Sequence, residues 1–224
     1  MIDQSAPATK PNSSHSTIVG ELPGNSFTDY RISTDLSSEL RVATLAYFSI
    51  QQEFNHIGKA IKSGATPKIE RISPLLEALV ASVIRNPAAG VWLARLKSKS
   101  SYAHRHCISC AILCALMGRQ LGLDEDAMFE LGLGGLFMDS GKLLLPDSLL
   151  RKTQSLTEEE QRETHSHTEL GLKAVKRAGL PDRVVQVIQH HHERFDGSGY
   201  PAGLKALIYP SMRELLLLST ATTP

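Results

Sequence analysis

The sequence predicts an all-α protein, and three observations support that prediction. Apolar side chains recur at spacings of three and four residues from residue 36 onward, which is the period of an amphipathic helix. Residues that start or stop helices separate these periodic segments. No stretch shows the sustained alternation of apolar and polar residues that is typical of a half-buried strand. A chain of 224 residues is also long enough to bury a core of its own, so we expect a helical bundle.

Composition along the chain suggests three parts. Residues 1–33 are rich in Ser, Thr, Pro, Asn and Gly and poor in large apolar side chains. Such a segment cannot offset the entropy of ordering, so we expect a flexible N-terminal arm. Residues 34–99 form an N-terminal helical segment, and residues 100–224 form the domain that carries the chemistry.

Two helices are expected in the N-terminal segment. The first runs from Leu36 to the stop signal Ser63-Gly64, with apolar residues at near-helical spacing. The second follows Thr66-Pro67 and ends before Asn86-Pro87, because an Asn-Pro pair disfavours continuation of a helix.

Four further helices are expected in the second half. One begins near Tyr102 and ends at Gly122, and Asp124 caps its successor, which reaches Asp139. Thr157 and Glu160 have capping-box spacing, and the helix that they open is expected to end near Gly179. Pro181 suits the first turn of a last helix, which ends in three consecutive histidines.

Charge and cysteine content limit the classes of partner and the compartment. The chain has 24 Lys and Arg against 23 Asp and Glu and no basic stripe, which argues against DNA or RNA binding. No apolar run approaches the roughly 20 residues that cross a bilayer, so membrane insertion is not expected. Cys107, Cys110 and Cys114 are odd in number and close together, which suits a buried helical face in a reducing, cytoplasmic environment.

Candidate metal ligands come from separate predicted helices. Imidazole and carboxylate together suit iron, manganese or zinc, and such ions make hydroxide available at neutral pH. Taken singly, each of these histidines would more often be a surface or hydrogen-bonded side chain. We expect His104, His165 and His190 to be solvated. The candidate ligands are His106, Asp139, His167, His191 and His192.

A resemblance to a known family strengthens this interpretation. Residues 191–201 read HHERFDGSGYP, and this string resembles the signature of the HD-GYP family. The segments YAHRH, MDSGKLLLPDSLL and LTEEE, and a His167 followed four places on by Gly171, occur in family order. The resemblance covers residues 100–220 well and residues 36–99 more loosely.

The resemblance implies a fold, a reaction and a set of site residues. It implies an HD-superfamily helical bundle that hydrolyses cyclic di-GMP to linear pGpG and GMP. It also implies that Asp139 bridges two metal ions and that Lys142 neutralises the substrate phosphate. The five candidate ligands above would hold the metals. The loop beside the substrate would be formed by Asp196, Gly197, Gly199, Tyr200 and Pro201.

The chain departs from the family pattern at two ligand positions. Met138 stands where the histidine before the aspartate is expected, and Thr220 stands where a later aspartate is expected. Both losses fall on one metal, which would keep only His106 and Asp139, so we expect at most one ion per chain. The resemblance also leads us to expect that the HD-GYP-like domain of residues 100–224 is truncated at its C-terminus, before the final helices of the family.

These departures leave two classes of function open. The first is a phosphodiesterase whose activity is weak or absent. The alternative is a non-catalytic regulator that binds a cyclic nucleotide or a signalling-protein partner, or a gene fragment without function.

Overall fold

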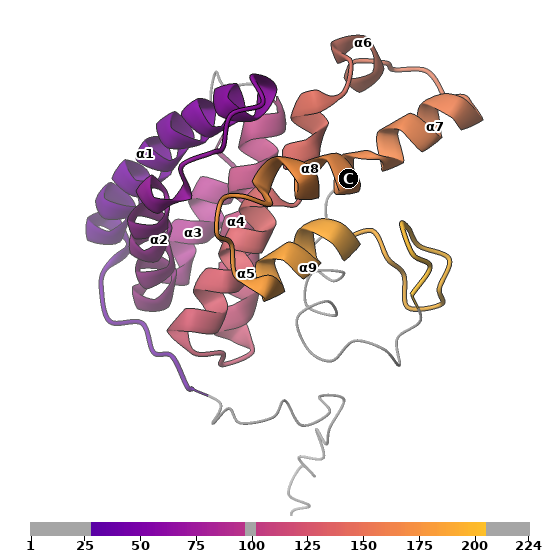
Figure 1. Ribbon diagram of the computed structural model, residues 1–224. Helices are drawn as coiled ribbons and strands as arrows, with labels where there is room; N and C mark the ends of the chain where they lie inside the picture. The colour runs from indigo at the N-terminus through magenta and orange to yellow at the C-terminus, as the bar shows by residue number, and fades with distance from the viewer. Residues whose placement is uncertain (1–27, 97–101, 205–224) are drawn as a thin grey trace, which may run out of the picture.

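The computed structural model describes residues 28–96 and 102–204, and it confirms the all-α prediction. No β-strand occurs in these two ranges. Figure 1 shows α4 and α5 at the centre, with α1 to α3 on one side and α8 and α9 on the other. The helices in chain order are α1 (Leu36–Lys62), the 3-10 turn η1 (Ile69–Arg71), α2 (Ser73–Arg85), α3 (Pro87–Ala94), α4 (Tyr102–Gln120), α5 (Glu125–Phe137), the 3-10 turn η2 (Ser140–Leu144), α6 (Asp147–Leu150), α7 (Glu158–His165), α8 (His167–Val175) and α9 (Asp182–His190).

The first helix begins and ends where the sequence predicts. The carboxylate of Asp35 accepts a hydrogen bond from the backbone N–H of Ser38 at 3.0 Å, which satisfies a free donor of the first turn. The buried side chains Tyr47, Ile50 and Phe54 lie on one face of α1. This face packs into the larger of two apolar clusters, which also takes side chains from α2, α4 and α5.

An ion pair joins α1 to the end of α2. The buried carboxylate of Glu39 accepts hydrogen bonds from Arg85 Nη2 at 2.7 Å and from Arg85 Nε at 3.0 Å. The hydroxyl of Thr34 donates to the same carboxylate at 2.8 Å. These contacts fully partner a buried charge, which would otherwise destabilise the fold.

The sequence prediction missed α3. The prediction took Asn86-Pro87 only as the end of a helix, whereas the structure uses the pair as an end and as a start. The Asn86 side chain accepts a hydrogen bond from the backbone N–H of Ala88 at 3.1 Å, and Pro87 is the first residue of α3. Asn as N-cap and Pro at the first helical position are both favoured.

The single helix predicted to end near Gly179 is wrong, because the structure has two helices, α7 and α8, that meet at Ser166. Near this junction the carbonyl of Thr164 accepts a hydrogen bond from the ring Nδ1–H of His167 at 2.7 Å. The break therefore sets the orientation of a candidate ligand. The capping box at the start of α7 is confirmed, since Thr157 and Glu160 exchange both hydrogen bonds.

Part of the predicted arm is attached to the bundle. The backbone N–H of Thr28 donates to Gly122, and the Tyr30 hydroxyl donates to the carbonyl of Leu123 at 2.8 Å. Residues 1–27 and 205–224 lie outside the described residues, so the rest of the arm and Thr220 are not placed.

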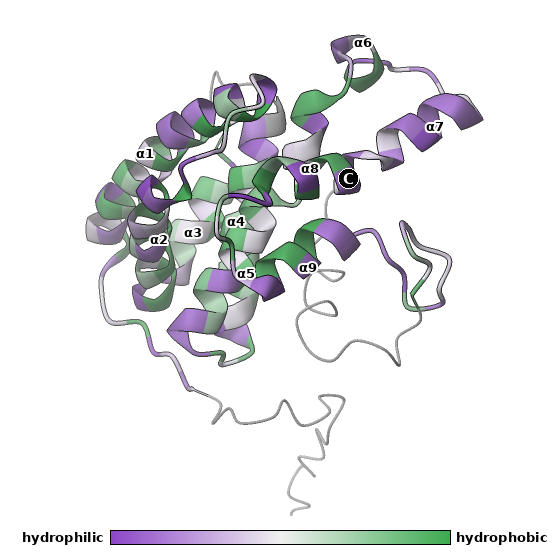
Figure 2. Cartoon of the chain, in the orientation of Figure 1, coloured by the Kyte–Doolittle hydropathy of each residue, from purple (hydrophilic) through white to green (hydrophobic). Residues whose placement is uncertain are grey.

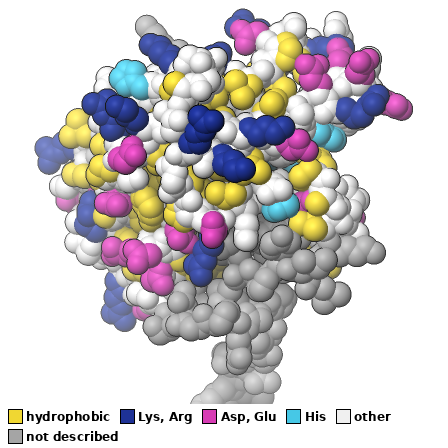
Figure 3. Space-filling model, viewed as in Figure 1, with side chains coloured by type: hydrophobic (Ala, Val, Ile, Leu, Met, Phe, Trp, Pro, Cys, Tyr) yellow, Lys and Arg dark blue, Asp and Glu magenta, His cyan; other side chains and the backbone are white. Residues whose placement is uncertain are grey.

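The surface is mixed in character. Figure 2 shows α7 as mostly hydrophilic, and this helix has no buried residue. Basic and acidic side chains are interspersed on the face seen in Figure 3. Within the two described ranges, no helix has the length and apolar character that a membrane crossing would require.

Candidate metal centre

Four of the five predicted ligands converge beside α8. Asp139 follows α5 and precedes η2, and His167 is the first residue of α8. His191 is the C-cap of α9, and His192 follows it. One donor atom from each of these four residues lies within 4.8 Å of the other three. Three of the side chains are buried and that of His192 is partly buried. In the described residues no other group of three or more such side chains meets this spacing.

A close backbone contact brings α8 to Asp139. A Cβ atom on Gly141 in η2 would lie 1.8 Å from the carbonyl oxygen of His167 and 2.5 Å from the backbone nitrogen of Gly171. Only glycine allows this approach. Gly141 lies in the turn that follows Asp139, and Gly171 lies one turn of α8 after His167. The contact between the two glycines therefore holds the start of α8 against the turn that contains Asp139.

The tautomers of two histidines follow from their hydrogen bonds. The Nδ1 atoms of His167 and His191 lie 2.7 Å from the carbonyl of Thr164 and 3.1 Å from that of Ile188. A carbonyl oxygen only accepts, so each Nδ1 carries the proton and each Nε2 presents a lone pair. This is the arrangement that orients histidines bound to metals.

The lone pairs of these rings face other acceptors. His167 Nε2 lies 3.3 Å from His191 Nε2, and the two atoms lie 3.4 and 3.5 Å from Asp139 Oδ1. His192 Nε2 is buried and has no hydrogen-bond partner among the described residues. Acceptors that face one another repel, whereas a shared cation attracts all of them. The donor set, three imidazoles and one carboxylate, fits a divalent ion such as zinc, iron or manganese.

The protonation states favour metal binding at neutral pH. Burial, and then the charge of the neighbouring His191, lower the pKa of His167 to about 4 and that of His192 to about 2. Burial alone would raise the pKa of Asp139. The adjacent His106 and His191 rings and the charge of Lys142 outweigh burial and hold that pKa well below its usual value. At neutral pH His167 and His192 are thus neutral imidazoles and Asp139 is a carboxylate, the forms that bind metals.

His106 and Lys142 contact Asp139 without joining the four-donor cluster. His106 Nε2 lies 3.2 Å from Asp139 Oδ2, the other carboxylate oxygen. Lys142 Nζ lies 2.9 Å from Oδ1, on the side of the cluster. The Lys142 side chain is 30% exposed, so it can also meet a group that arrives from solvent.

Met138 packs into the apolar core. Its side chain is only 1% exposed and belongs to the smaller apolar cluster, together with Cys110, Cys114 and Val187. Burial raises the pKa of the Cys110 thiol, so this cluster stays uncharged. The position that the family resemblance assigns to a ligand therefore contributes to the core instead.

The predicted substrate loop is built around a carboxylate that the sequence analysis did not single out. Glu193 is fully buried, and it accepts hydrogen bonds from the backbone N–H groups of Ala202 at 2.6 Å and Leu204 at 2.8 Å. A Cβ on Gly199 would lie 2.2 Å from the backbone nitrogen of Arg194, so this position requires glycine. An acidic residue directly after two candidate ligands was the available signal for Glu193.

Two histidines expected to be solvated have other roles. His190 is buried, with Nδ1 3.9 Å from Glu193 Oε1, because it lies on the inner side of the last turn of α9. His165 stacks on Tyr200, with ring centroids 3.7 Å apart and an angle of 11° between the planes. Tyr200 also stacks on His192, at 4.6 Å and 18°.

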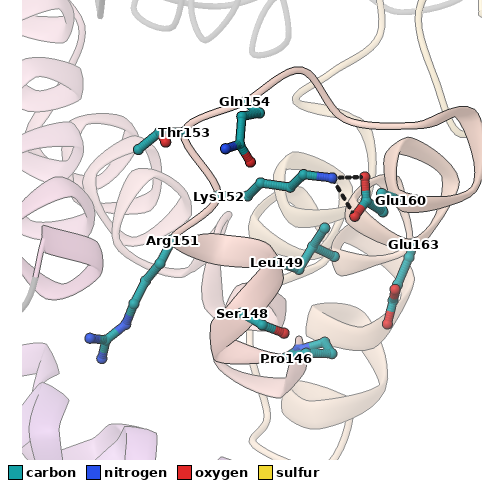
Figure 4. A pocket seen from close by; sticks show the side chains of 9 residues that line it. All are labelled: Pro146, Ser148, Leu149, Arg151, Lys152, Thr153, Gln154, Glu160 and Glu163. Carbon is teal, nitrogen blue, oxygen red and sulfur yellow. Dashed lines mark hydrogen bonds and ion pairs between the residues drawn. The ribbon is translucent and has the colours of Figure 1, made fainter.

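A surface pocket of about 470 Å³ lies between α6 and α7 and contains none of the predicted ligands. Figure 4 shows Lys152 directed toward Glu160, 2.6 Å away, and Arg151 directed away from both. Both basic and acidic side chains line this pocket, so it is not a positively charged site for a phosphate-bearing substrate.

Comparison with known proteins places the chain in a family. The model of the HD domain matches residues 85–210. A cyclic di-GMP phosphodiesterase of Pseudomonas aeruginosa is 34% identical over 170 residues, which cover 75% of this chain and 41% of that protein. A 3'3'-cGAMP-specific phosphodiesterase of Vibrio cholerae is 34% identical over 108 residues, or 48% of this chain and 25% of that protein. The chain thus matches less than half the length of each of these two relatives.

The fold comparison agrees. An HDG"Y"P protein of Bdellovibrio bacteriovorus superposes with a TM-score of 0.68 at 19% identity, covering 82% of this chain and 60% of that one. The chain therefore belongs to the HD domain family and is homologous over most of its length to HD-GYP proteins.

Proposed function

We propose that this chain is a metal-dependent phosphohydrolase domain that hydrolyses cyclic di-GMP or a related cyclic dinucleotide, and that it does so slowly because it holds one metal ion. The observation that carries the proposal is the buried cluster of acceptors formed by Asp139 and three histidines. The relatives named above support the substrate class, because their names specify cyclic di-GMP and cGAMP.

The residues of the cluster have separable tasks in this proposal. Asp139, His167, His191 and His192 would hold the ion, and hydrogen bonds to backbone carbonyls orient His167 and His191 before it binds. A bound divalent ion would supply Lewis acidity and lower the pKa of a water molecule. Lys142 stands beside Asp139 and donates hydrogen bonds to the phosphoryl oxygens as negative charge develops there.

Slow turnover follows from the side chains around Asp139. A second ion on the Oδ2 side would have His106 and Asp139 as its ligands, since Met138 lies in the apolar cluster. Two protein ligands do not complete a metal site, because catalytic sites in proteins usually provide three. The reaction then lacks the clamp on both attacking and leaving oxygens that paired metals provide.

The same observation favours a second function, that of a regulator which binds a cyclic dinucleotide or a signalling partner without turnover. The two functions share the four-ligand site and the loop around Tyr200 and differ only in the fate of the nucleotide. A bound nucleotide recovered intact would identify the regulator.

Metal content and turnover, measured on the same sample, test the proposal. Protein purified without oxygen should contain about one equivalent of iron, manganese or zinc, as expected for one complete ligand set. His191→Ala should remove it. His56→Ala is the matched control, because His56 is exposed on α1 with its ring 3.7 Å from Glu53. Metal that survives His191→Ala would refute the assignment of the site.

A gain of function tests the second-metal argument. The double substitution Met138→His and Thr220→Asp should raise the metal content and speed hydrolysis of cyclic di-GMP. Met138→Leu with Thr220→Asp is the control, since it keeps an apolar side chain in the core. Equal metal content in both double variants would contradict the argument.

A further inference from the structure

The ring of His192 is held by different contacts from those that hold the rings of the other two candidate ligands. His167 and His191 each donate Nδ1–H to a backbone carbonyl, which fixes the plane of the ring. No hydrogen bond to the His192 ring occurs among the described residues. Its nearest aromatic neighbours are the tilted ring of His191 at 4.2 Å and the stacked ring of Tyr200 at 4.6 Å.

Tyr200 is itself held between two imidazoles. On one face it stacks on His192, and on the other it stacks on His165 at 3.7 Å with an angle of 11°. His165 is the last residue of α7, whereas Tyr200 belongs to the loop after α9. The three rings therefore form a stack that joins the loop to α7 and ends on a candidate metal ligand.

The rest of the loop is anchored mainly on Glu193, which precedes Asp196 by three residues. Glu193 accepts hydrogen bonds from the N–H groups of Ala202 and Leu204, and Tyr200 N–H donates to the carbonyl of His192 at 3.3 Å. These bonds set the shape of the loop. They do not attach it to α7, whereas the stack of Tyr200 on His165 does.

We propose that His165 is a positioning residue of the metal centre, which presses Tyr200 against His192 and so fixes the plane of that ligand. The inference rests on the proposed function, because it takes His192 as a metal ligand. The stack does for His192 what the Nδ1–carbonyl hydrogen bond does for the other two histidines. Groups that orient metal-bound histidines act on affinity from outside the ligand set.

Zinc affinity tests this role. His165→Gln keeps polarity but removes the ring, and the dissociation constant for Zn²⁺ should rise about three- to tenfold, the range that one aromatic pair contributes. His165→Phe restores a flat ring and should return the constant to within about twofold of the unmodified protein. His56→Gln, on the exposed side of α1, is the control and should have no effect.

A double-mutant cycle distinguishes action through Tyr200 from a general structural effect. Tyr200→Ala removes the middle ring, so His165→Gln should cause no further loss of zinc affinity in that background. An equal loss in both backgrounds would overturn the proposal, as would a His165→Phe variant that binds zinc as weakly as His165→Gln.

A second readout does not depend on metal. In protein stripped of metal, His165→Gln should speed hydrogen exchange of the amides in residues 196–204, and His165→Phe should not. If the unmodified protein binds no zinc, the proposed function fails, and the exchange rates still decide whether His165 holds the loop. Unchanged exchange in His165→Gln would refute that hold.

Discussion

Replacing Gly141 by alanine should separate the turn that carries Asp139 from the helix that carries His167. A Cβ at this position would lie 1.8 Å from the carbonyl oxygen of His167, whereas ordinary contacts begin at 3.4 Å. The difference, 3.4 − 1.8 = 1.6 Å, is the distance by which one backbone segment must move. The three atoms nearest to this Cβ all belong to the backbone, so rotation about side-chain bonds cannot relieve the clash.

The expected magnitude follows from that displacement. Overpacking of a closely packed interior costs about 1–3 kcal/mol, and we expect the upper end because backbone meets backbone. For a domain of this size each kcal/mol lowers the melting temperature by about 2–4 °C. We therefore expect Gly141→Ala to melt about 6–12 °C lower. Its zinc affinity should fall about 10- to 100-fold, as when the support of a ligand is lost.

Thermal unfolding followed by circular dichroism, together with zinc competition against a chelator, provides the assay. The matched control is Gly132→Ala in α5, where a Cβ would meet its nearest atom at 3.5 Å, so alanine fits and its higher helix propensity offsets any small cost. If both variants melt at the same temperature and bind zinc equally, the close approach does not position His167.

Three further predictions concern the ion pair, the loop and a helix start. Hydrogen bonds from Arg85 lower the pKa of Glu39 from 4.5 to about 2, so the unfolded chain binds the extra proton and stability falls as the pH drops from 4.5 toward 2. The loss is about 2 kcal/mol after discounting for the solvent-exposed part of Arg85, and Glu39→Gln should flatten this pH dependence in urea unfolding. Glu193→Ala removes the charged acceptor of two backbone N–H groups and should cost about 2–3 kcal/mol, with faster proteolysis of the loop than in Asp196→Ala. Thr157→Ala should cost about 1 kcal/mol in urea unfolding, and Thr153→Ala should cost less because no capping bond involves Thr153.

Local signals in the sequence predicted most helices, and they failed where one residue pair has two roles. Asp124 and Thr157 cap helices through their own side chains, so neighbouring residues alone reveal them. Asn86 ends α2 and caps α3 at the same time, and the sequence analysis assigned it only the first role. The break at Ser166 lies within a stretch of continuous helical spacing, so that pattern did not reveal it.

The four members of the buried cluster were predictable from the sequence, but their arrangement in space was not. The residue types and the loop string indicated Asp139, His167 and the histidines after α9. The approach of His167 to Asp139 depends on the contact between Gly141 and Gly171, which joins segments distant along the chain. The burial of Glu193 and the stack on His165 are likewise tertiary features, so sequence spacing could not reveal them.

The residue before Asp139 can either bind a second metal ion or fill the apolar core, and these two roles require different side chains. On the Oδ1 side, the three histidines gain their orientation from backbone carbonyls and ring stacking, and none of these contacts involves Met138. At position 138 the side chain fills the apolar cluster beside Cys110 and Met128. A histidine there would gain a ligand for a second metal but would bury a polar ring among apolar side chains, which costs about 1–3 kcal/mol unless the metal satisfies it. The free energy of unfolding of metal-free Met138→His should therefore be lower than that of the unmodified protein. Added zinc should recover the lost stability, because a ligand that binds only the folded state stabilises it.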